Sequence, residues 1–423
     1  MTSSCLKAGP VEFNATTSHM KLYDVAFTVY HALDSRALVA LSAAANASAA
    51  DEAKLEARAA ATETALHRDL FDAGEGQYAN KLYNGTFYKR WAPTIFAPML
   101  LNSTPASRIP RMMAMMGNSS TFCVSASPEK VPLDVGAANA TNVTILWRMQ
   151  ADAVSYMAPG QSITCASEAC LQATVLDVAE FGGIEAIVDA NRNALASLPL
   201  QIYRATSGGD RSADQVLSTK SPGAEYTLAN ASAAPEGWCA PAASGGYTQP
   251  LMLWYSPSLS DHRTCGGTPG CSAAQMGKDG YAVANGGVPL CFAKSAVDVG
   301  SIPCRYGMPS ISRSDVDGAG KSTFWEQTYW RGRIWAPQYF LVYAGLKAQE
   351  HLPSARAKKA ELADQAKRLF TQQLELFGQV NENTNGVLGV GSDNTRADAY
   401  YHWGALHALI AIAETGAYPS SML

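Results

Sequence analysis

The sequence has no run of eighteen apolar residues, so no segment of it is long enough to cross a membrane as a helix. It has no cluster of Lys and Arg, and its formal net charge of −4 gives no reason to expect a nucleic-acid partner. The first twenty residues contain neither the basic segment nor the apolar core of a signal peptide. What is there, with 47% hydrophobic and 16% charged residues, is the composition of a folded protein with a substantial core.

Two features nevertheless favour the secretory pathway or an extracellular location. Sequons of the form Asn-x-Ser/Thr mark surface positions in secreted proteins. Eight of them occur, at Asn14, Asn46, Asn84, Asn102, Asn118, Asn139, Asn142 and Asn230. Of nine cysteines, all except Cys5 lie between Cys123 and Cys304. We expect these eight to pair among themselves and to leave Cys5 free, with no connectivity assigned. Because no signal peptide accompanies these features, we expect the natural N-terminus to lie further upstream.

Zinc binding is the alternative use of so many cysteines. Zinc sites commonly contain a C-x2-C pair or a cysteine pair combined with histidines. No C-x2-C pair occurs here, and His262 is the only histidine near the cysteine-rich segment. We therefore favour disulfides and expect neither a metal ion nor another cofactor.

The hydrophobic pattern separates helical outer parts from a different middle. Apolar residues at three- and four-residue spacing predict helices over 20–46 and 51–74, after 104, from 334, after 354 and near 399. The middle is rich in Gly, Ser, Pro and Cys and has short β-type runs at 251–255 and 280–283, with one helix expected from Ile184 to Leu198. We expect three parts, which are residues 1–122, an inserted disulfide-rich and mostly β domain at 123–305, and residues 306–423.

Three motifs near the C-terminus carry the chemistry. Trp330-Arg331-Gly332-Arg333-Ile334-Trp335 opens one expected helix, and Tyr401-His402-Trp403-Gly404-Ala405-Leu406 opens another. Between them, Asn381-Glu382-Asn383-Thr384-Asn385 places a carboxylate in a turn. Trp presents a flat apolar face that suits the C–H face of a sugar ring, and Arg presents five donors for hydroxyls or a carboxylate. A single Trp is usually a core residue, but repeated aromatic helix entrances favour a binding surface.

The three motifs resemble the C-terminal catalytic region of glycoside hydrolase family 63, which includes processing α-glucosidase I and mannosylglycerate hydrolases. Stretches at 10–25, 71–78 and 307–313 also resemble this family, so that the likeness extends over 10–118 and 307–416. The family fold is an (α/α)6 barrel. The resemblance therefore implies a mainly α protein in which about six helices form an incomplete (α/α)6 barrel, with the inserted domain added to it.

The resemblance also implies an inverting exo-α-glycosidase, acting on an α-glucoside or α-mannoside in an oligosaccharide or a small α-glycoside. Such enzymes use one carboxyl group as acid and another as base for the attacking water. The family's base maps onto Glu382, although Thr384 stands where the family has Tyr, and Tyr339 where it commonly has Asn. The substrate-binding residues implied are Trp330, Arg331, Trp335, His402, Trp403 and Asp24.

The general acid of the family is an Asp in a Ser-Gly-x-Asp-Asn-Ser-Pro segment, and no such segment occurs in this sequence. We therefore expect a chain that is incomplete or inactive as it stands, with a missing upstream half that would supply the acid and the remaining barrel helices. Helices without those partners should expose a large apolar surface. The alternative is a non-catalytic glycan-binding or scaffold protein that keeps the aromatic surface without the acid.

Overall fold

The computed structural model describes residues 13–14, 16, 19–125, 143–151, 162–165, 179–189, 191–206, 214–229, 235–266, 273–294, 306–316, 323–324, 330–386 and 401–416. The chain divides into two compact units. Unit 1 comprises Met1–Ser127, Cys304–Gly389 and Tyr400–Leu423, and unit 2 comprises Pro128–Pro303 and Val390–Ala399. Each unit has hydrophobic clusters of its own.

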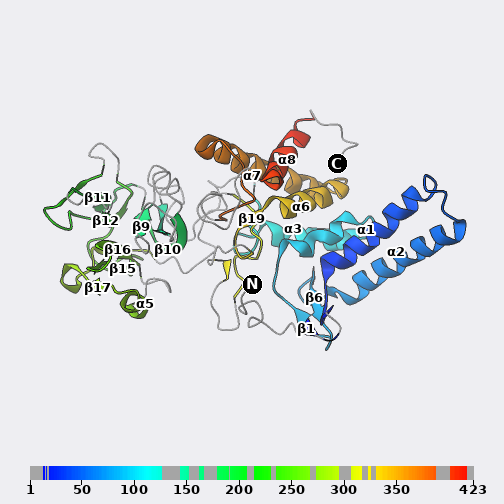
Figure 1. Ribbon diagram of the computed structural model, residues 1–423, viewed down its shortest axis with the longest axis horizontal. Coiled ribbons are helices and arrows are strands. Elements are labelled where there is room, and N and C mark those ends of the chain that lie inside the picture. Colours follow the sequence, from blue (N-terminus) through cyan, green and yellow to red (C-terminus); the bar gives the residue numbers. More distant parts are fainter. Residues whose placement is uncertain are drawn as a thin grey trace. The chain divides into compact units, whose positions relative to one another are not determined.

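Unit 1 contains the long helices (Figure 1). They are α1 (Val25–Ser42), α2 (Ala49–Asp69), α3 (Ile109–Gly117), α6 (Ala336–Ala348), α7 (Pro353–Phe377) and α8 (Leu406–Glu414), with the 3-10 helices η2 (Pro93–Leu100), η3 (Ala106–Arg108) and η9 (His402–Ala405). Helices α1 and α2 pack side by side, and α6, α7 and α8 pack against one another. The helical segments expected in the outer parts of the sequence are therefore present.

Local sequence signals set the ends of these helices. Ser48 caps α2, where its hydroxyl accepts a hydrogen bond from the backbone N–H of Asp51 at 3.2 Å. Proline occupies the first turn of α6 and of α7, where no backbone donor is needed. Gly378 adopts the left-handed conformation that ends α7, and its N–H donates to the Leu374 carbonyl at 2.9 Å.

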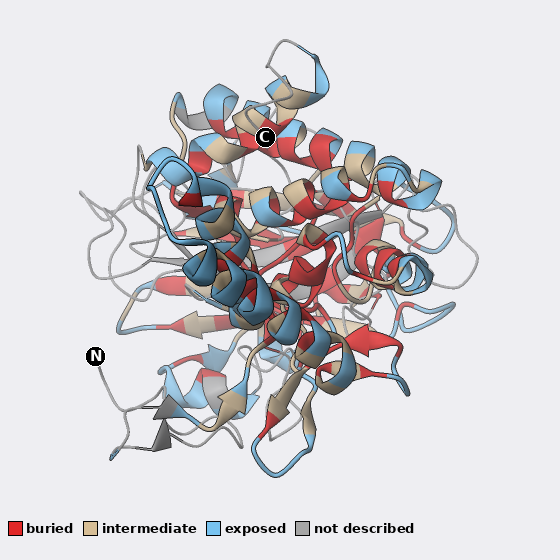
Figure 2. Cartoon of the chain, turned by 90° about the vertical axis from the view of Figure 1, so that its right-hand side faces the viewer, coloured by how far each residue is buried: buried red, intermediate tan, exposed pale blue. Residues whose placement is uncertain are grey.

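The apolar stripes of the helices meet in one core of unit 1. Leu66 of α2, Met112 of α3, Leu346 of α6, Leu369 of α7 and Ile410 of α8 all have no exposed surface. Figure 2 shows the buried faces of helices in red and the exposed faces in pale blue. Burying apolar surface stabilises a fold by about 25 cal/mol per Å². The helices of unit 1 obtain this stabilisation from one another.

Short strands connect the helices of unit 1. A three-stranded antiparallel sheet contains β3 (Leu22–Tyr23), β6 (Asn80–Leu82) and β7 (Phe87–Tyr88). Two-stranded antiparallel pairs are formed by β1 (Phe13–Asn14) with β2 (His19–Met20), β4 (Phe71–Asp72) with β5 (Gln77–Tyr78), and β19 (Ile334–Trp335) with β20 (Asn383–Thr384).

Unit 2 is built mainly from antiparallel strands. One sheet contains β8 (Val143–Ala151), β9 (Ser162–Cys165), β10 (Ala179–Asp189), β11 (Leu198–Ala205), β12 (Gln215–Ser218), β13 (Tyr226–Leu228) and β14 (Gly237–Cys239). The other contains β15 (Gln249–Ser256), β16 (Asp261–Cys265), β17 (Ala282–Val283) and β18 (Cys291–Ala293). Two short helices, α5 (Ala273–Lys278) and η6 (Asn285–Gly287), complete it.

Disulfide bonding is present among the clustered cysteines. Cys239 and Cys291 form a disulfide that joins β14 to β18, with the Cα atoms 5.9 Å apart. Cys123 and Cys265 each take part in a disulfide bond as well. The side chains of the other five cysteines lie outside the described residues. The expectation that eight cysteines pair among themselves and leave Cys5 free therefore stays a prediction.

The fold class expected from the sequence is wrong. The described residues form sheets in both units as well as the helices of unit 1, so the chain is a mixed α/β protein and not a mainly α, incomplete (α/α)6 barrel. The physical reason in unit 1 is that strands of two or three residues form by pairing with other segments, which the hydrophobic pattern does not reveal. The helices also bury their stripes against one another. The stripe on α7, formed by Leu362, Ala366 and Leu369, has no exposed surface, so it is not the large apolar face expected of an unpartnered helix.

The expectation of a helix from Ile184 to Leu198 is also wrong. Residues Ile184 to Asp189 belong to β10, whose backbone pairs with β8 over nearly its whole length. The strand is followed by irregular backbone and then by β11. A short apolar run reads equally well as helix or strand, and here the neighbouring strand decides the outcome.

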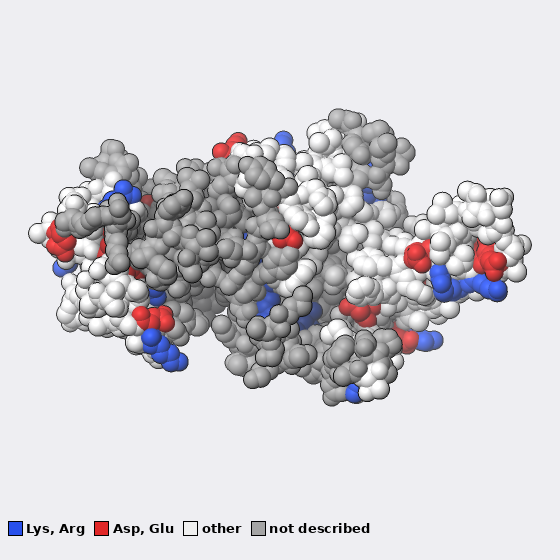
Figure 3. Space-filling view, viewed as in Figure 1, with Lys and Arg blue, Asp and Glu red and all other residues white. Residues whose placement is uncertain are grey.

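The described residues also bear on the expectations about membrane helices and charge. In the described segments no helix is both long enough and apolar enough to span a membrane. On the face shown in Figure 3, many Lys and Arg side chains lie close to Asp and Glu side chains. Between α1 and α2, for example, Arg36 pairs with Glu63 at 2.5 Å and Arg58 with Asp34 at 3.5 Å. Opposite charges therefore sit close together on this surface.

An ion pair joins two of the three chain segments that build unit 1. Arg90 binds Asp315 through Nη2 and Oδ2 at 2.5 Å and through Nε to both carboxylate oxygens at 3.2 Å. The side chains are 22% and 4% exposed, and the bond to Asp315 raises the pKa of the Arg90 guanidinium. Two residues before Asp315, the backbone N–H of Arg313 donates to the Thr121 carbonyl at 2.8 Å. The pair thus fixes two distant segments against each other.

We predict that Asp315→Ala lowers the free energy of unfolding of unit 1 by about 3 kcal/mol, because it leaves a largely buried guanidinium without its partner. The double variant Arg90→Met/Asp315→Leu should lose clearly less, because neither charge is left alone. Urea denaturation followed by circular dichroism measures both. A double variant that is as unstable as Asp315→Ala would contradict this role of the pair.

Candidate functional site

Two of the three sequence motifs are joined by a strand pair in unit 1. In the antiparallel pair of β19 and β20, Trp335 lies opposite Asn383 and Ile334 lies opposite Thr384. Glu382 immediately precedes β20, so the pairing sets it beside the Trp335 strand. From the same segment, the fully buried Arg333 donates a hydrogen bond from Nε to the side-chain oxygen of Asn383.

The third motif is held against the same turn by a close backbone contact. Gly404 of η9 lies so near the Asn381 carbonyl that a Cβ atom on it would overlap that oxygen. Gly386 approaches the Gly332 carbonyl in the same way at the other end of the turn. Only glycine permits such an approach without moving the backbone. The segments 330–335, 381–386 and 402–405 therefore converge at one place.

The turn from Asn381 to Asn385 is buried, although a Glu in an Asn-rich turn is normally solvated. Its five residues are between 0% and 6% exposed, and Glu382 is 6% exposed. Gln373 of α7 holds the turn, because its Oε1 accepts from the backbone and side-chain N–H groups of Asn381 at 3.1 and 3.3 Å. A carboxylate in such surroundings interacts more strongly with nearby charges and dipoles than one in water.

Three tryptophans, hereafter the tryptophan cluster, lie beside this turn. Trp330 stacks on Trp335 with ring centroids 4.5 Å apart and planes 9° apart, and Trp403 lies 6.4 Å from Trp335. Trp335 is 3% exposed, whereas Trp330 and Trp403 are 63% and 37% exposed. Trp335 therefore supports the outer ring of Trp330. Trp330 and Trp403 each leave apolar ring surface exposed, of the kind on which an apolar face of a ligand can pack.

Two further expected binding residues flank the tryptophan cluster. Arg331 follows Trp330 in the chain and is half-buried. His402 precedes Trp403, is exposed, and stacks on the Tyr401 ring with centroids 5.2 Å apart and planes 19° apart. Both carry donors that could meet ligand hydroxyls at the edge of the aromatic surface. Of the seven residues singled out from the sequence, six thus lie on the three converging segments.

Asp24 has a different place. It is the N-cap of α1, where Oδ1 accepts from the backbone N–H of Phe27 at 2.9 Å. Its Oδ2 accepts from the amide of Asn80 at 2.9 Å, and the Asn80 oxygen accepts from the Val25 N–H at 2.9 Å. These bonds join the start of α1 to β6. A structural role as a helix cap accounts for Asp24, which has no contact with the tryptophan cluster among those found in the described residues.

His407 belongs to the surroundings of the site, although the sequence reasoning did not single it out. It lies one helical turn after Trp403 and is 2% exposed, with its ring 5.1 Å from the ring of Tyr339. Within the described part of the chain, neither ring nitrogen has a hydrogen-bond partner. Burial lowers the pKa of His407 to about 3 and raises the pKa of the Tyr339 hydroxyl. The four-residue spacing from Trp403 is the signal that could have pointed to it.

Unit 2 has a set of buried polar pairs that serve its packing. Three tyrosine hydroxyls donate to buried carboxylates, in the pairs Tyr226–Asp214, Tyr247–Asp189 and Tyr281–Asp261. His262 also binds Asp214, through Nδ1 and Oδ2 at 2.7 Å. Burial and Asp189 raise the pKa of Tyr247 to about 12. Each pair joins different strands or loops, so these groups stabilise the sheet region by satisfying one another.

Comparison of the chain with protein-family models, with curated proteins and with solved structures gave no match. The arrangement of the turn, the tryptophan cluster and their supports is therefore the basis on which a function can be inferred. Among the described residues, no group of three or more His, Cys, Asp or Glu is placed to hold a metal ion.

We predict that His407 makes unit 1 sensitive to mild acid. Its folded-state pKa of about 3 lies below the unfolded-state value of about 6.5, so between these values only the unfolded state binds the proton. The free energy of unfolding therefore falls as the pH falls through this window. In His407→Leu this term is absent. The stability of the variant relative to the parent should rise by about 2 kcal/mol between pH 7.5 and pH 5.

Urea denaturation of both proteins at the two pH values measures this change. The control is His351→Leu, which removes an exposed imidazole and is measured in the same way. A His407→Leu variant whose relative stability does not depend on pH would show that the imidazole finds partners when it is protonated.

Proposed function

We propose that unit 1 binds the terminal sugar of an α-glycoside on the tryptophan cluster and that Glu382 is the base of an inverting hydrolysis. The observation that carries the proposal is the pairing of Trp335 with Asn383, which places the buried residue Glu382 next to the strand of Trp335. The resemblance of these motifs to glycoside hydrolase family 63 supports the same assignment. The sugar would be an α-glucoside or an α-mannoside.

The aromatic surface supplies binding and orientation. The C–H face of a pyranose packs on the exposed faces of Trp330 and Trp403, and Arg331 and His402 donate to its hydroxyls. Trp335 and Arg333 hold the turn in place through the β19–β20 pair and the bond to Asn383. A carboxylate that is fixed before substrate arrives needs no reorganisation in the transition state.

Glu382 then has the role of removing a proton from the water that attacks the anomeric carbon. An inverting reaction also needs an acid, with the two carboxyl groups roughly 6.5–9.5 Å apart to leave room for that water. The Ser-Gly-x-Asp-Asn-Ser-Pro segment that carries the acid in the resembling family does not occur in this sequence. The proposal therefore assigns the base and the sugar-binding surface to this chain and assigns no acid.

Non-catalytic glycan binding is the second candidate. Two observations favour it. The segment that carries the acid in the resembling family does not occur in this sequence. Trp330 is 63% exposed, which suits reversible contact with a glycan. In this case the tryptophan cluster would bind sugar and Glu382 would accept a hydrogen bond from a sugar hydroxyl.

An experiment with glycosyl fluorides separates the two candidates. Fluoride departs with little help from an acid, so a site that has only the base should still hydrolyse α-glucosyl or α-mannosyl fluoride. We predict release of fluoride with formation of the β-anomer, detected with a fluoride electrode and by proton NMR. Glu382→Gln should lower kcat for the fluoride by about 10²–10⁴-fold. It should change the affinity for methyl α-glucoside or methyl α-mannoside, the non-hydrolysed ligands, less than about threefold.

Control variants give each outcome a meaning. Glu375→Gln changes an exposed carboxylate on α7 and should leave turnover and binding unchanged. Trp330→Ala should weaken binding of the methyl α-glycoside in either candidate function. Binding without fluoride release would favour the non-catalytic candidate. If neither methyl glycoside binds, both candidate functions are excluded.

A further inference from the structure

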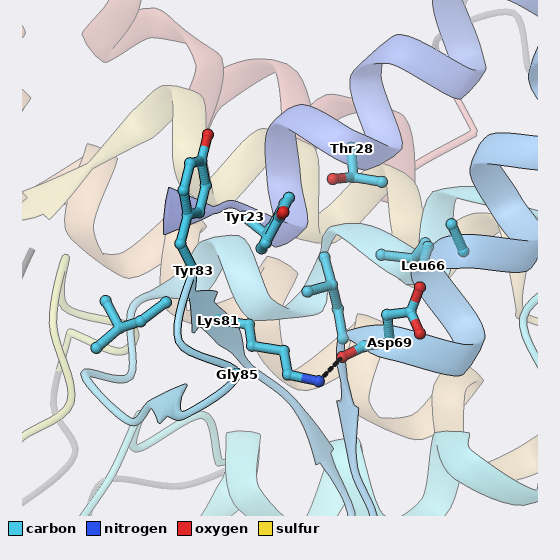
Figure 4. Close-up of a pocket in the computed structure, with 10 residues that line it drawn as sticks. Tyr23, Thr28, Leu66, Asp69, Lys81, Tyr83 and Gly85 are labelled. Atoms are coloured by element: carbon cyan, nitrogen blue, oxygen red, sulfur yellow. Dashed lines mark hydrogen bonds between the residues drawn. The ribbon is translucent and has the colours of Figure 1, made fainter. Parts of the chain in front are cut away.

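A pocket of about 400 Å³ lies beside the three-stranded sheet of unit 1 and is separate from the site proposed above. Figure 4 shows residues from α1, α2 and the sheet around it, among them Tyr23, Thr28, Leu66, Asp69, Lys81 and Tyr83. A volume in this range is ordinary for a small-ligand site and is large enough for a monosaccharide. The pocket is therefore a candidate binding site.

The walls of the pocket are aromatic and its floor is apolar. Tyr23 and Tyr83 lie with ring centroids 4.8 Å apart and planes 33° apart, and they are 53% and 55% exposed. Leu66, Leu70 and Leu82, which also line it, are at most 8% exposed. Exposed phenol rings above buried leucines offer a surface to a ligand that has one apolar face and polar edges.

The polar groups of the pocket favour an uncharged ligand. Lys81 donates from Nζ to the backbone carbonyl of Asp69 at 3.4 Å (Figure 4), and its ammonium lies 5.0 Å from the centre of the Phe87 ring. The Asp69 carboxylate is bound by Arg68 at 2.8 and 2.6 Å. The lining thus carries one cation and one anion, so its charges balance. Hydroxyl and amide groups are suited to meet such a mixed pair.

A glycosylation sequon lies at the rim of this pocket. Asn84, Gly85 and Thr86 form the exposed turn between β6 and β7, in which the Asn84 side-chain oxygen accepts from the Thr86 N–H at 3.0 Å. The residues on both sides of Asn84, Tyr83 and Gly85, line the pocket. A sugar attached to Asn84 would therefore start next to the aromatic wall.

We propose that Asn84 is N-glycosylated and that the first sugar of the glycan, an N-acetylhexosamine, occupies this pocket against Tyr23 and Tyr83. The donor is an oligosaccharide on a lipid diphosphate. The bond between Asn84 Nδ2 and C1 of the sugar forms, and the bond from C1 to the diphosphate oxygen breaks. The diphosphate leaves with the bonding electrons, and the amide nitrogen gives up one proton.

The chemical groups of the first sugar match the side chains that line the pocket. An N-acetylhexosamine is uncharged, has a C–H face for the tyrosine rings, and has an amide and hydroxyls for Lys81 and the Asp69 carboxylate. Seated there, it covers two tyrosines that are otherwise more than half exposed. This assignment does not depend on Glu382 or on the tryptophan cluster.

Occupancy is tested by expressing the full chain with a secretion signal in eukaryotic cells and analysing the peptide that contains Asn84 by mass spectrometry. We expect glycan on Asn84 in the parent and in Thr86→Ser, and none in Thr86→Ala or Asn84→Gln. Secreted, folded protein that is unmodified at Asn84 would overturn the proposal.

Seating in the pocket is tested by the rate at which a peptide N-glycosidase releases the Asn84 glycan from the folded protein. A first sugar packed on the tyrosines is shielded, so Tyr23→Ala and Tyr83→Ala should each speed release by fivefold or more. Phe27→Ala removes an aromatic ring that is 74% exposed and lies outside the pocket lining, and it should leave the rate unchanged.

Denatured samples of the same proteins are the control for the enzyme itself, and all should release the glycan at one rate. Equal rates for the folded parent and both tyrosine variants would show that the glycan is attached but does not enter the pocket. That result would overturn the proposed seat even if Asn84 is modified.

Discussion

The antiparallel pairing of Ile334 and Trp335 with Asn383 and Thr384 is the contact on which the site in unit 1 depends. It fixes the register between the entrance of α6 and the turn that follows α7. Because opposed residues of a strand pair point to the same face, a shift of one residue would move the Asn383 side chain away from the face of Trp335. Arg333, Gln373 and Gly404 all act on the same turn, through a buried hydrogen bond, a side-chain acceptor and a backbone contact. Together they keep a carboxylate buried where a free turn would expose it.

The sequence was informative where a single periodic signal dominates. The helical spacing of apolar residues predicted the segments that became α1, α2, α6 and α7. The aromatic motifs at 330–335 and 401–406 were also recognisable as a pair of unusual helix entrances. Their meeting with the turn at 381–385 could be expected only from a family resemblance, because it depends on backbone contacts between distant segments.

The remainder could not be predicted because it is decided by partners far away in the chain. Strands of two residues, such as β19 and β20, are too short to show an alternating pattern, and they exist only because each has the other. The short strand pairs of unit 1, which the sequence analysis did not expect, were missed for this reason. Asp24 looked like a ligand-binding carboxylate, and one of its oxygens instead accepts a hydrogen bond from Asn80, which lies 56 positions away. His407 appeared as one more residue of a helical stripe, and its isolation from hydrogen-bond partners is a property of the packed core.

The discontinuity of unit 1 has a consequence for how the chain folds. Arg313 donates from Nη1 to the Ser119 carbonyl at 2.7 Å across 194 positions of sequence. Closing a flexible loop of that length costs about 5 kcal/mol of chain entropy by the logarithmic scaling of loop closure. Most of that loop is unit 2, whose segment Pro128–Pro303 is continuous and has hydrophobic clusters of its own. If that segment orders first, the flexible part of the loop becomes much shorter and the cost falls. During synthesis the core of unit 1 can be completed only after α6, α7 and α8, which contribute to it, have left the ribosome. The order of events in time would then be the middle of the chain first and its two ends last.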